Sequence, residues 1–520
     1  MNEQRIPAYL NLIQQLLDCP AGEENQILNQ FSELVDEGFV QMCEQKAAQL
    51  HEEGEENQAE FLQDLAQQVG AFLARPATEE NQPAALHQFW QQLLQAEAES
   101  GGDAAAVHQV MRPYMGLIVP VLGDIIAESM PRLLARNPDN AEGVIGLVED
   151  TCTSMQQFPD GRYGEVLEIA IRGYDVVLAL RADNPPKRAQ TLNNLGIAYQ
   201  TQAQFGLDPA AKLDQAITAY TESATIRRHL GLETDLAQTL NNLGNAYQTQ
   251  AEFGLDPAAK LDQAITAYSE AATIRRRPGL ETDLATTLTN LGAAYQTQAQ
   301  FGIDPAANLD QAITAYTEAV TMMRPSGLEK DLAATLNNLG NAYQTQAQFG
   351  IDSAANLDQA ITAYREAATI RRRPGLEKDL ARTLNNLGLT YQTQAQFGID
   401  PAASLEQAIK AYREAATIQR RPGLEKDLAG TLNNFGFAYQ TQSRLPSNSP
   451  DQKQTALENA YKAFAEALEQ VEYLRGEITT EDYKRQFNEQ WNQVYRDLVQ
   501  VCLELGNYTA AIEYADRSKA

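Results

Sequence analysis

Cysteine is scarce in this sequence. The 520-residue chain has only four, and none of them form the paired Cys-x-x-Cys spacing of zinc sites and redox motifs. A small secreted domain held together by disulfides is therefore excluded. We expect the cysteines to be reduced and mostly buried in a cytoplasmic protein. They are Cys19, Cys43, Cys152 and Cys502.

Long apolar runs are also missing. The most apolar stretch, 115–126, is short and contains Pro120 and Asp124, so we do not expect it to span a bilayer, which takes about 20 apolar residues. The first ten residues have no basic region followed by an apolar core, and we expect no signal peptide. A membrane is therefore not an expected partner.

The motifs of catalysis are absent. The sequence contains no phosphate-binding loop, no His-Glu-x-x-His zinc motif and no calcium-loop spacing. Cys43 and His51 are separated by about two helical turns, but nothing in the sequence orients them as a pair. Cys43 is better interpreted as a small core residue. We expect no catalytic residue, no metal ligand, no cofactor and no enzymatic activity.

Basic residues are few. The net charge is −29, and residues 1–160 account for −20 of it, against −9 for the rest. Such an acidic chain is repelled by nucleic-acid backbones and anionic membranes. We therefore expect no nucleic-acid partner. The uneven charge also indicates that the N-terminal part is a separate unit.

One motif recurs at a fixed interval of 48 residues. It is written LNNLG in most copies, and the copies are close to identical over the full interval. A period of this length indicates stacked structural repeats. The glycines that mark the six copies are Gly196, Gly244, Gly292, Gly340, Gly388 and Gly436.

Each copy reads as two helices. Apolar residues follow helical spacing around Leu192 and Tyr199 in the first helix, and from about Leu213 to Arg228 in the second. The second helix is preceded by Asp-Pro, an N-cap followed by proline at the first helical position. Neither helix buries its apolar stripe alone, and stacking of neighbours gives an all-α solenoid.

The motif spacing resembles the tetratricopeptide repeat. Leu195, Gly196 and Tyr199 match that family's Leu-Gly-x-x-Tyr in helix A, and Ala216 and Tyr220 match its helix B. The resemblance implies a helix-turn-helix unit with a concave groove lined by helix A. The period departs from the family's length of about 34 residues. We expect about eight of the extra residues, AQFGLDPA, between the helices and the rest in the PGLExDL linker.

Four segments follow from these patterns. Residues 1–137 contain no copy of the repeat and predict an acidic helical domain. Residues 138–184 predict a degenerate helical repeat, and 185–445 the regular array. Residues 446–520 predict repeat-like helices ending in an uncovered helix with Ile512 and Tyr514.

The last segment also resembles the connector of cyanobacterial TPR-CHAT proteins, through ALENAYKAFAEALEQVEYLRGEI and the residues that follow. The start of the chain resembles those proteins too. In that family the repeats precede a caspase-like CHAT peptidase domain, so the resemblance implies a CHAT domain in cis or in trans after Ala520. The alternative function is then the regulatory or sensor half of such a peptidase.

The principal hypothesis is a scaffold that binds a protein or peptide partner in the helix A groove. Asparagine is unfavourable inside helices, yet most copies keep two in tandem, and the residue after each glycine varies between copies. The Asn amides either clamp a partner's backbone or form a ladder that only sets the stacking, and exposed positions also drift freely. A purely structural spacer is the third possibility. The expected groove residues are Asn193, Ile197, Asn241, Asn245, Asn337, Asn341, Asn385, Leu389, Asn433 and Phe437.

Arginines cluster at the ends of the second helices, as in 275–277 and 371–373. They could bind an acidic partner or the acidic N-terminal domain. The simpler interpretation is that they interact with the helix dipole and stay solvated.

Overall fold

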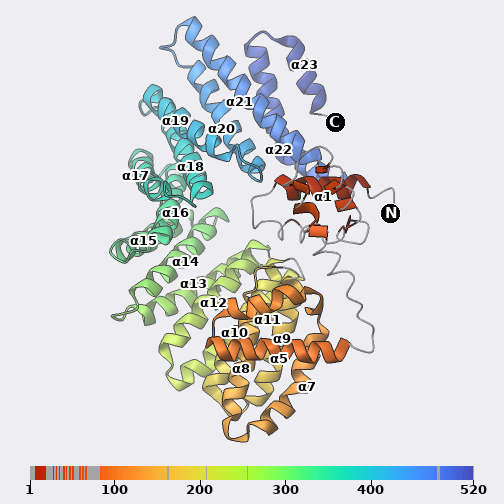
Figure 1. The fold of residues 1–520 in the computed structure, drawn as a ribbon. Helices are drawn as coiled ribbons and strands as arrows, with labels where there is room; N and C mark the ends of the chain where they lie inside the picture. Colours follow the sequence, from red (N-terminus) through yellow and green to blue (C-terminus); the bar gives the residue numbers. More distant parts are fainter. Residues whose placement is uncertain are drawn as a thin grey trace. The chain divides into compact units, whose positions relative to one another are not determined.

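The structure is a computed structural model that describes residues 6–18, individual residues between 27 and 66, and 82–160, 163–205, 208–254, 256–476 and 481–518. Side chains are not described for 481–490. Every regular element in these parts of the chain is a helix, as the repeat pattern predicts. The all-α fold class is confirmed (Figure 1).

The N-terminal third contains α1 (Ile6–Asp18), α5 (Gln82–Ser100), α6 (Ala104–Met111), η2 (Arg112–Leu117), α7 (Val121–Arg136) and η3 (Pro138–Asn140). Tyr9, Ile13 and Leu16 of α1 are buried in a cluster that includes Leu65. Helices α5–α7 share one apolar core with α8 (Ala141–Gln156), α9 (Tyr163–Leu180) and the first regular repeat.

Two kinds of helix alternate through the array (Figure 1). The A helices are α10 (Pro185–Gln204), α12 (Glu233–Glu252), α14 (Glu281–Gln300), α16 (Glu329–Gln348), α18 (Glu377–Gln396) and α20 (Glu425–Ser443). The B helices are α11 (Pro209–Leu230), α13 (Pro257–Arg275), α15 (Pro305–Met323), α17 (Ser353–Arg371), α19 (Pro401–Gln419) and α21 (Pro450–Gly476). The array is followed by α22 (Glu481–Glu504) and α23 (Tyr508–Arg517).

The extra length of the repeat lies mostly in the helices. The expected insertion of AQFGLDPA between them is wrong, because α10 runs to Gln204 and α11 begins at Pro209. Only Phe205–Asp208 separate the two helices. The linker is also shorter than expected, because its Glu is already the first residue of the next A helix, as at Glu281. The copies therefore have longer helices than the tetratricopeptide unit, rather than longer loops.

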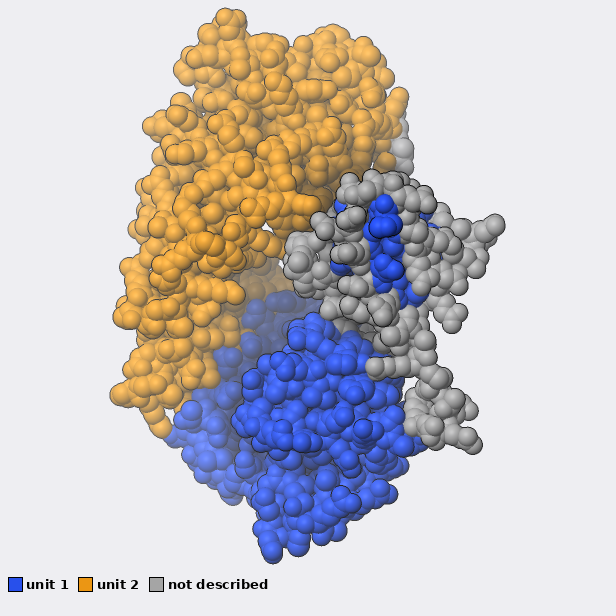
Figure 2. Space-filling model, viewed as in Figure 1, with its two compact units in different colours: residues 1–255 blue, residues 256–520 orange. Residues whose placement is uncertain are grey.

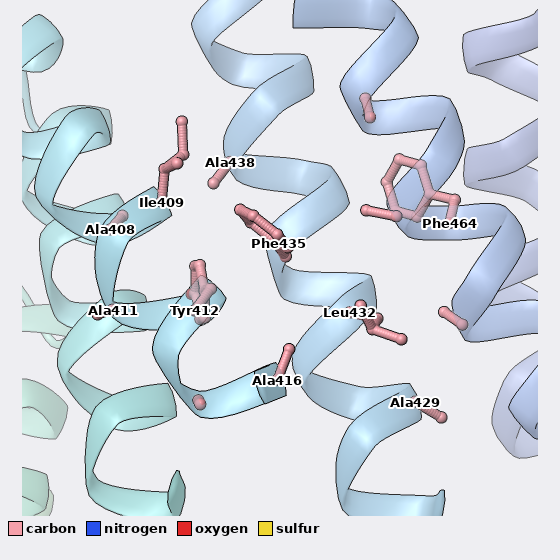
Figure 3. Close-up of a cluster of buried hydrophobic side chains, with 14 of the residues drawn as sticks. Ala408, Ile409, Ala411, Tyr412, Ala416, Ala429, Leu432, Phe435, Ala438 and Phe464 are labelled. Atoms are coloured by element: carbon pink, nitrogen blue, oxygen red, sulfur yellow. The ribbon is translucent and has the colours of Figure 1, made fainter. Parts of the chain in front are cut away.

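The motif glycine allows helix A and helix B to approach closely. A Cβ atom built at Gly388 would lie 2.7 Å from Cε1 of Tyr412, which is a clash. The Tyr412 hydroxyl donates to Oε1 of Gln392 at 3.1 Å. Phe435 and Phe464 continue this core between α19, α20 and α21 (Figure 3). Gly and Tyr thus recur together because one makes room for the other.

Clustering of contacts divides the chain into two units, residues 1–255 and 256–520 (Figure 2). The division falls inside the array, between α12 and α13. A solenoid packs only neighbour on neighbour, so its contacts mark no sharp domain edges. The boundaries expected at 137, 184 and 445 stay predictions.

No single described helix is long and apolar enough to cross a membrane. The pair Ala104–Leu117 and Val121–Arg136 passes such a test only when taken together, and it is bent by 119°. Cys152 and Cys502 are free thiols and buried, Cys43 is also buried, and Cys19 lies outside the described residues.

The C-terminal helices follow the expected pattern in part. Gly506 has a φ of +72°, and Asn507 caps α23 by accepting from the Ala510 amide. Ile512 is 65% exposed, as expected. Tyr514 is instead partly buried, with its hydroxyl 3.2 Å from that of Tyr461.

Candidate functional site: the A-helix face and the A-to-B edge

A buried polar node joins three helices at junctions between repeats. At the junction of α17 and α18, Arg371 is 4% exposed and donates to Oγ1 of Thr383 and to the Asp379 carbonyl. Thr383 in turn donates to Oδ1 of Asn337 on α16 at 3.2 Å. Burial lowers the pKa of Arg371. The node ties helix A, helix B and the next helix A together.

The same node recurs between α10, α11 and α12. Arg227 donates to Thr239, and Thr239 donates to Asn193 at 3.1 Å. The third copy replaces two members at once. Met323 occupies the position that Arg371 has in the next copy, and Thr289 occupies the position that Asn337 has there. Thr335 then lies 3.1 Å from Thr289 and 3.6 Å from the Met323 sulfur.

The first Asn of each pair is therefore mostly interior. Asn193, Asn241 and Asn337 are buried, whereas Asn385 and Asn433 are partly exposed. The hydrogen bonds are those of an inter-repeat ladder, the structural alternative considered for these amides.

The second Asn of several pairs also takes part in this ladder. Asn242 donates to Asn193 at 3.3 Å and Asn434 donates to Asn385 at 3.2 Å. At the start of the array, Asn194 donates to Glu149 of α8. The tandem Asn pair was the available signal, because two adjacent helical positions point about 100° apart and reach different neighbours.

The residue after each glycine stays partly exposed in every copy. These residues are Ile197, Asn245, Ala293, Asn341, Leu389 and Phe437. Among them, Asn341 accepts from the Tyr364 hydroxyl at 2.6 Å. The Phe437 ring packs edge-on against Phe464, with centroids 5.5 Å apart.

The arginine clusters are engaged within the array. Beside the buried Arg371, Arg372 pairs with Glu414 of the next B helix and Arg373 with Glu329. Arg276 and Arg420 make the corresponding pairs with Glu318 and Glu466. These paired arginines stay about half exposed, as expected for solvated side chains, and no partner is needed to account for them.

A row of exposed phenylalanines was also missed. One Phe follows each of the first five regular A helices, and each is about half exposed. These are Phe205 at 58%, Phe253 at 51%, Phe301 at 50%, Phe349 at 51% and Phe397 at 48%. The signal was the constant Phe-Gly of AQFG or AEFG, which the insertion hypothesis treated only as loop.

Cys43 and His51 are not arranged as a catalytic pair. Cys43 is fully buried in an apolar cluster, and His51 is exposed. Within the described residues, no group of three or more His, Cys, Asp or Glu side chains is placed to hold a metal ion.

No family model and no curated protein matches the chain. Solved structures are similar to it. Aspartyl phosphate phosphatase F from Bacillus subtilis has 14% identity over 77% of this chain and 93% of that one, with a TM-score of 0.39. A signal-transduction ATPase with a tetratricopeptide repeat sensor from Pyrococcus horikoshii has 12% identity over 78% and 55%, with a TM-score of 0.39. The human IFIT1 dimer with PPP-AAAA has 12% identity over 85% and 95%, with a TM-score of 0.33.

These TM-scores and identities carry no functional argument. The class of the chain rests on its own repeats and helix packing, which define an all-α solenoid of tetratricopeptide-like units. The resemblance to TPR-CHAT proteins stays a prediction, because no matched family supports it.

Proposed function

We propose that this chain is a scaffold that binds a partner polypeptide along the A-helix face. The observation that carries the proposal is where the repeats differ. Their interior positions are nearly copies, whereas the partly exposed residue after the glycine changes from Ile197 to Asn341, Leu389 and Phe437.

The proposed contact residues are the ones at this position: Ile197, Asn245, Asn341, Leu389 and Phe437. The first Asn residues, Asn193, Asn241, Asn337, Asn385 and Asn433, support them by fixing the spacing of the A helices. Leu389 and Phe437 lie on the neighbouring helices α18 and α20, which pack together. They provide the apolar end of the face, and aromatic side chains often dominate interface energy.

The test uses substitutions that the array already contains. Leu389→Asn and Phe437→Asn copy the residue that other repeats carry as Asn245 and Asn341. We expect peptides selected from a random library against the full chain to lose binding to the double variant, by about tenfold or more. The control is Thr286→Ala, an exposed A-helix change that copies Ala334.

Melting temperature is measured on the same variants. Unchanged affinity of all selected peptides for the folded double variant would sink the proposal. A selection that yields no binder to the wild-type chain would favour the structural spacer.

A further inference from the structure

We propose a second interaction surface, the Phe edge, which docks an extended polypeptide segment carrying apolar residues at every third position and Lys or Arg between them. The Phe edge comprises three A-to-B connections of the second unit, residues 298–310, 346–358 and 394–406. It contains none of the A-helix contact residues of the proposed function, and the inference rests on the side chains of these three connections.

The phenylalanines of this edge are not needed for the turn. At the end of α16, the Gly350 amide donates to Ala347 at 3.0 Å and the Ile351 amide donates to Gln346 at 3.3 Å. This is the Schellman pattern, which requires the left-handed Gly350, with φ of +77°. Phe349 occupies the C-cap, where the pattern sets no demand on the side chain.

The rings are also not part of the buried core. Phe301, Phe349 and Phe397 are about half exposed, and none takes part in an aromatic or cation–π contact within the described residues. In contrast, Phe205 lies 4.8 Å from Tyr163, centroid to centroid. Apolar side chains that stay half exposed at the same place on successive copies form a regular apolar row.

The charge at the edge is of one sign. The three segments contain six carboxylates and no Lys or Arg, and no carboxylate there is in an ion pair among the described residues. The acidic residues are Asp304, Asp310, Asp352, Asp358, Asp400 and Glu406, all exposed.

On α19 the exposed Lys410 lies one helical turn beyond Glu406, and the other cations inside these B helices are engaged elsewhere. Arg365 lies over the Tyr391 ring, 5.6 Å from its centroid, and Arg413 donates to the Tyr439 hydroxyl. The first two copies of the repeat differ at the equivalent position, because Lys212 and Lys260 stand there in place of Asn308 and Asn356. Asn308 instead donates to the Ile303 carbonyl of its own loop. The acidic, apolar edge therefore complements a cationic, apolar segment.

The spacing of the row fixes the form of that segment. Packed helices lie about 8–10 Å apart, and α14, α16 and α18 pack in succession. A chain in the extended polyproline II conformation rises about 3.1 Å per residue and has three residues per turn, so three residues cover one repeat and every third side chain points to the same side. Apolar side chains at every third position would each meet one Phe.

The experiment measures binding of a fluorescein-labelled ten-residue probe peptide to the full chain by anisotropy. The probe has leucine at every third position and lysine between. The test variant is F301A/F349A/F397A, and the matched control is Q300A/Q348A/Q396A, which changes the exposed residue immediately before each Phe. We expect the Phe variant to bind at least about tenfold more weakly and the control to bind within about twofold of wild type.

Charge and register are tested separately. D304N/D352N/D400N keeps residues that tolerate the left-handed conformation, and it should weaken binding and reduce its salt dependence. A probe of the same composition with its leucines clustered at one end should bind more weakly than the spaced probe. Equal binding of both probes, or unchanged affinity of the folded Phe variant, would overturn the proposal. So would tighter binding of RNA or anionic vesicles than of the spaced probe.

Discussion

Tyr364 and Phe349 recur in the same repeat, and they differ completely in burial. Tyr364 is fully buried and donates to Gln344, whereas Phe349 is 51% exposed. The tyrosine is explained by the glycine that it covers, since a Cβ at Gly340 would lie 2.7 Å from its ring. The phenylalanine has no such explanation. A side chain can therefore recur in every copy either because packing requires it or because another role does. Substitutions distinguish these two reasons.

The largest expected effect is in the interior. Gly388→Ala places a Cβ 2.7 Å from Tyr412, and overpacking of a core costs about 2–3 kcal/mol. The control is Gly430→Ala in α20, where no atom lies within 4 Å. This second change should stabilise by up to about 1 kcal/mol through helix propensity. Denaturant unfolding of both variants is the measurement, and equal effects would contradict the packing account of the glycine.

The next effect tests whether the node acts as a unit. Arg371→Met leaves Thr383 and the Asp379 carbonyl without the guanidinium and should cost about 2 kcal/mol. Asn337→Thr should cost about 1 kcal/mol. The double variant recreates the Met323, Thr335 and Thr289 combination of the third copy. We therefore expect it to be more stable than the sum of the single changes predicts, a coupling of about 1 kcal/mol. Strict additivity would show that the node members act independently.

At a third interior position, the contribution to folding stability depends on pH. Asp497 of α22 is 7% exposed, and burial raises its pKa to about 6, while Gln493 donates to one of its oxygens. Its other carboxylate oxygen has no partner among the described residues. Because the folded state holds the proton more tightly than the unfolded state, stability falls as pH rises from about 4 to 6 and then stays low.

Asp497→Asn should therefore stabilise the chain by about 1–2 kcal/mol at pH 7.5 and have little effect near pH 4. Thermal melts across this range provide the measurement, with the exposed Asp451 changed to Asn as the control. A stabilisation that is the same at both pH values would contradict the role of ionisation.

The sequence predicted the interior better than the surface. The 48-residue period, the two helices and the solenoid follow from apolar spacing, because buried positions must repeat for neighbours to stack. The helix start after Asp-Pro was also correct where that pair occurs, as at Asp304 and Pro305, although Asp304 makes no side-chain cap hydrogen bond. The predicted position of the extra residues was wrong. The residues Phe-Gly-Ile-Asp indicate a loop but not its length. Only the structure shows that the residues on either side of them belong to helix A and helix B.

The hydrogen-bonding role of the Asn pairs could not be decided from spacing. Asn193 and Asn194 are adjacent in the sequence, but one is buried beside Thr239 and the other reaches Glu149. Which neighbour an amide meets depends on how successive A helices are rotated, and that rotation is set by the packing of whole helices. In one copy of the sequence, Thr289 replaces the Asn and Met323 replaces the Arg. This joint replacement identifies the members of the node once the structure shows that they are in contact.

The smallest effect on stability is expected at the exposed Phe, and its contrast with the adjacent glycine decides between a structural and a binding role. Phe349→Ala removes a half-exposed ring at the C-cap and should change the unfolding free energy by no more than about 0.5 kcal/mol. Gly350→Ala forces an alanine into a left-handed conformation, with φ of +77°, at a cost of about 1–2 kcal/mol. Chemical denaturation of the two variants compares them directly. A loss at Phe349 equal to that at Gly350 would make the ring part of the turn, and its recurrence would then need no partner to explain it.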